Sequence, residues 1–196
     1  MNSDNFFRIV AGAIIVAFYA IYFGKMLSQR WRGIRTDQIA RGTKSPKLFA
    51  TELTMKIATY STVCVQIASI WLGTTLPYPA LRVIGVVLGV AGVVVFGVAV
   101  VTMRDSWRAG IPSEDRTGLV TGGIFNVSRN PAFVGFDLVY AGIVAICFNP
   151  LLVGISVVSA VMLHLQILRE EEYLTATFGK PYTDYITKTR RYFGRR

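Results

Sequence analysis

Five apolar segments constrain the fold of this chain more than any other feature. They cover, approximately, residues 6–27, 53–72, 81–103, 132–148 and 151–168. Segments of about 20 apolar residues cross the hydrocarbon core of a membrane as helices, because a helix satisfies its backbone hydrogen bonds internally. We therefore expect an all-α integral membrane protein with about five transmembrane helices, organised as a single membrane domain over residues 1–196.

Composition and charge favour a membrane protein over a nucleic-acid-binding one. Charged residues make up 16% of the chain, whereas soluble domains carry about 25%. The net charge is +10, but Lys and Arg gather at the ends of the apolar segments instead of alternating with aromatic residues along a groove. We expect a membrane as partner and no nucleic acid. Cys64 and Cys147 lie inside apolar segments without C-x-x-C spacing, so no metal site is predicted.

The apolar segments divide the chain into four parts. These are three N-terminal spans, a cytoplasmic loop, a helical hairpin and cytoplasmic C-terminal helices, over residues 1–103, 104–131, 132–168 and 169–196. Asn149 and Pro150 separate the two arms of the hairpin, because the residue before a proline avoids helical geometry. In the last part, a short amphipathic helix is predicted over about 182–191.

Basic residues orient the predicted bundle. They gather after the first span, after the third span and in the C-terminal tail, whereas residues 73–80 and 148–150 carry no charge. The positive-inside rule then places the three basic regions in the cytoplasm and the N-terminus outside. We expect a bacterial inner-membrane protein of this orientation.

Gly85 and Gly89 in the third span have the small-xxx-small spacing that lets helices approach closely. Packing within the chain explains this spacing, and a homodimer face is the alternative.

An Arg-Asn-Pro turn opens the fourth span. Pro131 suits the first helical turn, where its missing N–H costs nothing. Exposed N–H groups at a helix N-terminus, next to Arg129, favour an anion such as a carboxylate. The simpler alternative is an interfacial arginine that extends to the lipid headgroups.

Further ionisable residues lie on the hairpin. Asp137 and His164 fall at similar depth on the two arms and are predicted to pair, either as a structural contact or near a substrate. Glu170 and Glu171 follow the fifth span within a run of three glutamates, and the hairpin returns them to the same membrane face as the Arg-Asn-Pro turn. A solvated helix face is the simpler interpretation, but three like charges favour a cationic partner beyond Arg169, either a ligand or Arg129 and Arg108. In the polar loop, Trp107 and Arg108 are candidate substrate contacts on position alone.

These segments resemble the isoprenylcysteine carboxyl methyltransferase and phospholipid methyltransferase superfamily. The family carries Gly-x-Tyr-x-x-x-Arg-His-Pro-x-Tyr-x-Gly, then a hairpin, then Glu-Glu-x-x-Leu-x-x-x-Phe-Gly-x-x-Tyr-x-x-Tyr. The second motif is complete here, from Glu170 to Tyr185. The first motif matches from Gly123 to Gly135, except that Asn130 stands for the family's His, and Phe125 and Phe133 stand for its Tyr. Asn can form hydrogen bonds but cannot titrate.

The resemblance implies S-adenosylmethionine as methyl donor, bound between the Arg-Asn-Pro segment and the C-terminal helices. Arg129, Glu170 and Glu171 become candidate catalytic residues, with the glutamates at the cationic end of the donor. The implied cofactor-binding residues are Gly123, Asn130, Pro131, Phe133, Gly135, His164, Tyr182 and Tyr185. Trp107, Arg108 and Asp137 remain candidates for the substrate side.

We therefore expect methyl transfer to a lipophilic or lipid-attached carboxylate or amine at the cytoplasmic face. The lack of a titratable His at position 130 leans toward an anionic acceptor, because an amine must first lose a proton. The alternative is a non-catalytic lipid-binding or assembly protein that keeps the fold. A reductase or a transporter is less favoured, since five spans hold neither a nicotinamide site nor an inverted repeat.

Overall fold

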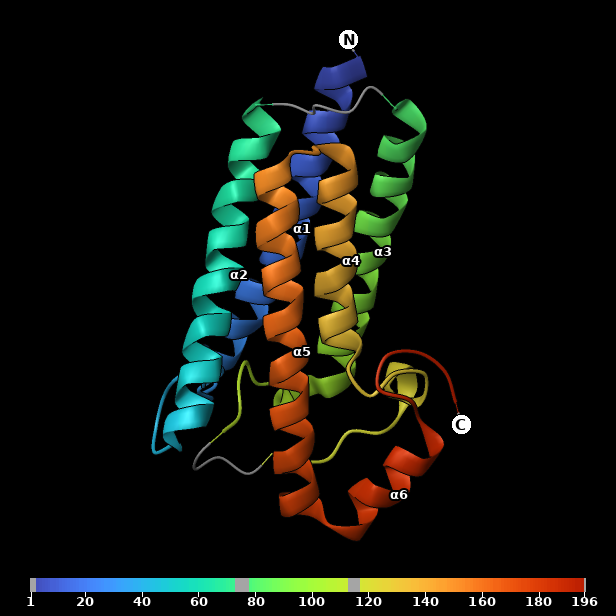
Figure 1. The fold of residues 1–196 in the computed structure, drawn as a ribbon. Coiled ribbons are helices and arrows are strands. Elements are labelled where there is room, and N and C mark those ends of the chain that lie inside the picture. Colours follow the sequence, from blue (N-terminus) through green and yellow to red (C-terminus); the bar gives the residue numbers. More distant parts are fainter. Residues whose placement is uncertain (1–2, 73–77, 113–116, 196) are drawn as a thin grey trace.

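The computed structural model describes residues 3–72, 78–112 and 117–195, and it is helical with no strand in these ranges. The long helices are α1 (Ser3–Trp31), α2 (Pro46–Leu72), α3 (Pro79–Met103), α4 (Pro131–Ile146) and α5 (Pro150–Phe178). Shorter helices are η1 (Arg104–Ser106), η2 (Gly123–Asn126) and α6 (Lys180–Lys188). Figure 1 shows the five long helices side by side, running alternately in opposite directions. The predicted all-α integral membrane class is confirmed.

The helices differ in how well each suits a membrane. Three segments are long and apolar enough to cross a bilayer by length and composition: Ser3–Trp31, Pro79–Ser106 and Pro150–Phe178. α2 has 27 residues but is less apolar, and α4 is apolar but has only 16 residues. A 16-residue helix is about 24 Å long, less than the ~30 Å hydrocarbon core. The five predicted spans thus correspond to α1–α5, with α2 and α4 as the less typical members.

The hairpin turns where the sequence predicts it. The Asn149 side chain accepts a hydrogen bond of 2.9 Å from the backbone N–H of Leu152 and so caps α5, with Pro150 in its first turn. α5 then continues as one helix through the three glutamates to Phe178. Gly179 (φ +56°) ends α5 and lets the chain turn into α6. Residues 189–195 follow α6, and we call them the C-terminal strap.

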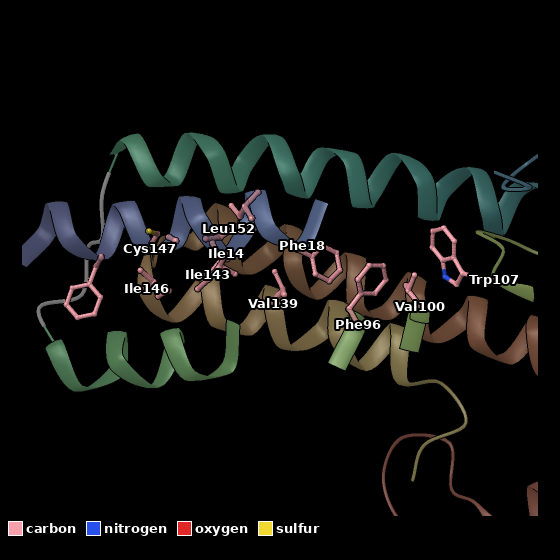
Figure 2. Close-up of a cluster of buried hydrophobic side chains, with 13 residues drawn as sticks. Ile14, Phe18, Phe96, Val100, Trp107, Val139, Ile143, Ile146, Cys147 and Leu152 are labelled. Atoms are coloured by element: carbon pink, nitrogen blue, oxygen red, sulfur yellow. The ribbon is translucent and has the colours of Figure 1, made fainter. Parts of the chain in front are cut away.

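The apolar core runs along the bundle between α1, α3, α4 and α5. Among the residues labelled in Figure 2, Ile146 and Cys147 lie toward one end of the core and Trp107 lies at the other. The Phe18 ring lies 4.4 Å from the Phe96 ring and 4.7 Å from the Phe136 ring, centroid to centroid. Such close aromatic packing matters because lipid tails are as apolar as the core, so tight contacts hold membrane helices together.

Glycines bring α3 and α4 into backbone contact. A Cβ at Gly142 would lie 2.6 Å from the backbone nitrogen of Gly89 and 2.7 Å from the carbonyl oxygen of Gly85. A Cβ at Gly135 would lie 3.0 Å from the carbonyl oxygen of Gly92. The small-residue spacing in the third span is therefore occupied within the chain, and no observation in the described residues supports the homodimer alternative.

Candidate functional site

The loops gather at one end of the bundle, opposite the N-terminus. In Figure 1 the segment between α1 and α2, the segments between α3 and α4, and α6 with the strap all lie at this end. Glu52 of α2 holds two of these segments together. It is fully buried, and its carboxylate accepts hydrogen bonds from the N–H groups of Ala40 (2.7 Å) and Ile111 (3.0 Å) and from Lys44 Nζ (2.5 Å). This pairing fixes the loop that contains Trp107 and Arg108 against α2.

A cavity lies among these loops and the adjoining ends of the helices. It is lined by one polar set and one aromatic set of side chains. The polar set comprises Lys56, Thr59, Arg108, Arg129, Asn130, Gln166 and Glu170. The aromatic set comprises Tyr19, Tyr22, Phe23, Tyr60, Phe96, Trp107, Phe125, Phe133 and Phe136. One cavity therefore joins an ionisable end to an apolar interior.

The apolar interior reaches the outside of the bundle between α1 and α2. Phe23 of α1 and Tyr60 of α2 both line the cavity, yet they are 47% and 49% exposed. Tyr22 and Trp107 lie deeper, with their rings in edge-to-face contact at 5.4 Å between centroids. Phe23 and Tyr60 therefore mark where the cavity meets the outer surface of the bundle, and we call this opening the lateral mouth.

Arg129 lies at the centre of a buried ion network. Its Nη2 donates to Glu171 Oε1 at 2.8 Å and its Nη1 to the Thr189 carbonyl at 2.9 Å. Arg191 of the strap donates to the same carboxylate from Nη2 at 2.7 Å and from Nε at 3.1 Å. One carboxylate thus binds two guanidinium groups and joins α4, α5 and the strap. We call Arg129, Glu171 and Arg191 the strap network.

Asn130 extends the strap network. Its Nδ2 lies 3.3 Å from Glu171 Oε1 and 3.2 Å from the Arg191 carbonyl oxygen, so it donates to both. Its backbone N–H donates to Ser128 Oγ at 3.1 Å. At the position where the resembling family has His, this chain therefore uses the two amide N–H groups to hold the strap.

Glu170 and Glu171 are neighbours in sequence but meet opposite surroundings. Burial raises the pKa of Glu171, but the hydrogen bonds from Arg191 and Arg129 outweigh it and lower that pKa below its ordinary value. Glu170 lies just beyond the apolar part of α5, which ends at Leu168, and it lines the cavity. Desolvation raises the pKa of Glu170 to about 7, against a smaller lowering by the hydrogen bond from Gln166. Near neutral pH, Glu171 is ionised and Glu170 is close to its titration midpoint.

Asp137 and His164 do not form the predicted pair. His164 Nδ1 is hydrogen-bonded to the hydroxyl of Tyr192 in the strap, and the two rings stack at 6.0 Å. Asp137 Oδ1 is buried without a hydrogen-bond partner among the described residues. Neither residue lines the cavity. The strap therefore takes the contact that the sequence assigned to Asp137.

Four other candidates lie outside the cavity lining. Tyr182 and Tyr185 are buried in a cluster with Phe125, where the Tyr185 hydroxyl donates to the Phe125 carbonyl at 2.5 Å. Gly123 (φ +61°) serves a turn against Thr102, and Gly135 packs on α3. By contrast, seven candidates meet at the cavity: Trp107, Arg108, Arg129, Asn130, Pro131, Phe133 and Glu170.

Sequence reasoning missed Gln166 and the cavity residues of α1 and α2. Gln166 precedes Glu170 by one helical turn, and a polar residue at that spacing in an apolar helix was the available signal. Tyr19, Tyr22 and Tyr60 gave no comparable signal, because aromatic residues are common in lipid-facing helices. The described residues contain no group of three or more His, Cys, Asp or Glu side chains placed to hold a metal ion.

The family model for phospholipid methyltransferases matches residues 79–181, more than half of the chain. The match runs from the start of α3 into α6 and includes Arg129, Glu170 and Glu171. The class is thus that of membrane methyltransferases, and the chain belongs to the phospholipid methyltransferase family. No curated protein matches it.

Proposed function

We propose that this protein transfers a methyl group from S-adenosylmethionine to a lipophilic or lipid-attached acceptor. The main support for the proposal is that a single cavity connects a polar end with an apolar interior. Glu170 lies at the polar end, and the lateral mouth lies at Phe23 and Tyr60. A water-soluble cationic donor and a lipophilic acceptor need these two different environments within one cavity. The family membership supports methyl transfer in general.

The residues at the polar end fit the donor. S-adenosylmethionine supplies its methyl group from a positively charged sulfonium and also carries an ammonium and a carboxylate. Glu170 forms no ion pair among the described residues, so its carboxylate is available to a cation. Arg129 lines the same end, and its guanidinium offers the donor's carboxylate a positive charge and the second N–H of Nη2. The aromatic side chains Trp107 and Phe133 offer faces for a cation or for the adenine.

Glu171 supports this site without lining it. Its carboxylate fixes the guanidinium of Arg129, which has the family's arginine position, and holds the strap beside it. Methyl transfer requires the acceptor in line behind the sulfonium methyl, so rigid placement of the donor contributes to the rate. We therefore assign Glu171 a positioning role and Glu170 the direct contact.

The acceptor enters through the lateral mouth in this proposal. Its lipophilic part lies among Tyr19, Tyr22 and Phe136, and its reactive group faces the donor bound at the polar end. We further propose that the end with the cavity faces the cytoplasm of a bacterial cell, where the methyl donor is made. The basic segments after α1 and α3 and the basic strap lie at this end, as the positive-inside rule requires.

The test uses the full-length protein purified in detergent. Isothermal titration with S-adenosylmethionine is expected to show micromolar binding, and incubation with the donor and a membrane lipid extract is expected to release S-adenosylhomocysteine. Binding without product, across extracts that contain amine and carboxylate lipids, supports the lipid-binding alternative, which the structural use of Asn130 favours. No binding at millimolar donor overturns the proposal.

A further inference from the structure

We propose that Gln166 and Glu170 together form a subsite for a protonated amine. The proposal rests on the proposed function and names the group that this end of the cavity recognises. The amine comes from one of two sources, the amino group of the methyl donor or the head of an amine acceptor. Both present the same chemistry, an ammonium with several N–H donors.

Gln166 is a buried amide whose carbonyl oxygen has no hydrogen-bond partner among the described residues. It is 0% exposed and lies on α5, one turn before Glu170. Its Nε2 donates to Glu170 Oε1 at 3.1 Å. Its Oε1 is buried and accepts no hydrogen bond among the described residues. Both side chains line the cavity.

The amide orientation follows from its neighbour. In the ionised form of Glu170 the carboxylate only accepts hydrogen bonds, so the Nε2 of Gln166 faces Glu170 and its Oε1 is left without this partner. A buried acceptor without a donor is costly, and a leucine at this position would avoid the cost. An ammonium bound beside both residues supplies the missing donor to Oε1 and a positive charge to Glu170.

The charges around the cavity favour a cation beside Glu170 and Gln166. Among the described lining residues Glu170 is the only acid. Three basic side chains also line the cavity: Arg129 pairs with Glu171, Lys56 pairs with Asp37, and Arg108 donates to the carbonyl groups of Asp105 and Trp107. Glu170 and the Gln166 carbonyl are thus acceptors on two neighbouring side chains of the cavity lining, and the ligand that satisfies both is an N–H cation.

The test compares Gln166→Leu with a matched control, Gln66→Leu. Gln66 is also 0% exposed, both of its amide atoms lack partners among the described residues, and it lies on α2 outside the cavity lining. A change that arises from removing a buried amide affects both variants, whereas loss of the amine contact affects only Gln166→Leu.

Two arms separate the two sources of the amine. In the first, S-adenosylhomocysteine and its deaminated analogue are titrated into each protein. In the second, protein saturated with S-adenosylhomocysteine is titrated with decylamine and with decanol. We expect Gln166→Leu to weaken the amine-containing ligand of one pair about tenfold, the typical value of one charge-assisted hydrogen bond, and its neutral counterpart less than twofold. The pair that responds identifies the source.

The proposal fails if Gln166→Leu leaves both amine ligands within twofold of the wild type, or if Gln66→Leu weakens them equally. Gln166→Glu keeps an acceptor at the site and is expected to retain the preference for the amine over its neutral counterpart. Failure of the wild type to bind S-adenosylhomocysteine counts against the proposed function instead, and decylamine then tests the subsite in the unliganded protein.

Discussion

Two adjacent carboxylates of α5 are used in opposite ways. Glu171 belongs to the strap network, where Arg129 and Arg191 satisfy it completely. Glu170 points to the cavity and has an amide as its hydrogen-bond partner. Neighbouring residues on a helix differ by about 100° in direction, so one turn of α5 serves two regions. The comparison separates a carboxylate that holds the protein together from one that is left for a ligand.

The strap network predicts the largest effect. Glu171→Gln leaves two guanidinium groups without a carboxylate, and Arg129 is buried. We expect a loss of about 3 kcal/mol in the free energy of unfolding, since breaking a buried ion pair leaves an uncompensated charge. Denaturant unfolding in detergent measures it. Glu172→Gln is the control, because that side chain is 73% exposed and should change stability by less than about 0.5 kcal/mol. Equal stability of the two variants would contradict the distinction.

A substitution of Glu170 is predicted to weaken binding without a loss of stability. Glu170→Gln removes the negative charge that we assign to the donor's cationic end, so the Kd for S-adenosylmethionine should rise about 30- to 100-fold. Stability should stay the same or increase, because Glu170 has no ion pair among the described residues. Titration calorimetry and unfolding measured on the same preparation test both parts. A variant that unfolds easily yet binds normally would exchange the roles of the two glutamates.

A change of pH distinguishes Glu170 from Glu171 without a substitution. With its pKa raised to about 7 by desolvation, Glu170 is neutral at lower pH and charged at higher pH. Glu52 raises this pKa further, whereas Lys44 and the Gln166 amide lower it. Affinity for the cationic donor should therefore fall as the pH drops through about 7, approaching tenfold per unit.

Glu171, whose pKa is lowered, stays ionised over that pH range and keeps the strap in place. The control is Glu170→Gln, in which the pH dependence should disappear. Binding that is flat between pH 5.5 and 8.5 in the wild-type protein would show that Glu170 does not face the donor.

The smallest effect is expected at Asn130. Asn130→Ala removes two donors, to Glu171 and to the Arg191 carbonyl, but both ion pairs of the network remain. The expected loss is about 1 kcal/mol in the free energy of unfolding. Asn130→His tests the side chain of the resembling family at the same place, and an equal loss in both variants would show that the amide geometry is required.

The sequence predicted the helices well because long apolar segments and an Asn-Pro break leave few alternatives. It also predicted that the Arg-Asn-Pro turn and the glutamates meet, since the hairpin between them returns to the same end. It could not predict which glutamate binds Arg129, because that depends on the rotation of α5 about its axis. Backbone carbonyls of the strap, which bind Arg129 and Asn130, have no signature in the sequence.

The residues of α1 and α2 that line the cavity were missed for a related reason. Tyr22 and Tyr60 come from different helices, and only tertiary packing places both at one cavity. The partner of His164 was wrong because Tyr192 reaches it from the strap, 28 residues away. Long-range contacts made by a short irregular segment are the part of this fold that periodicity does not encode.

The glycine contact between α3 and α4 determines which helices of the bundle can move apart. The backbones of α3 and α4 touch at Gly89 and Gly142, so no layer of side chains between them can rearrange. We therefore expect these two helices to move as one rigid pair. The family match begins at Pro79, the first residue of this helix pair. Any widening that admits a bulky lipid is then expected to come from α1 and α2, which form the lateral mouth. Relatives with differently shaped acceptors are therefore expected to vary in their first two helices and to keep the glycine contacts between α3 and α4.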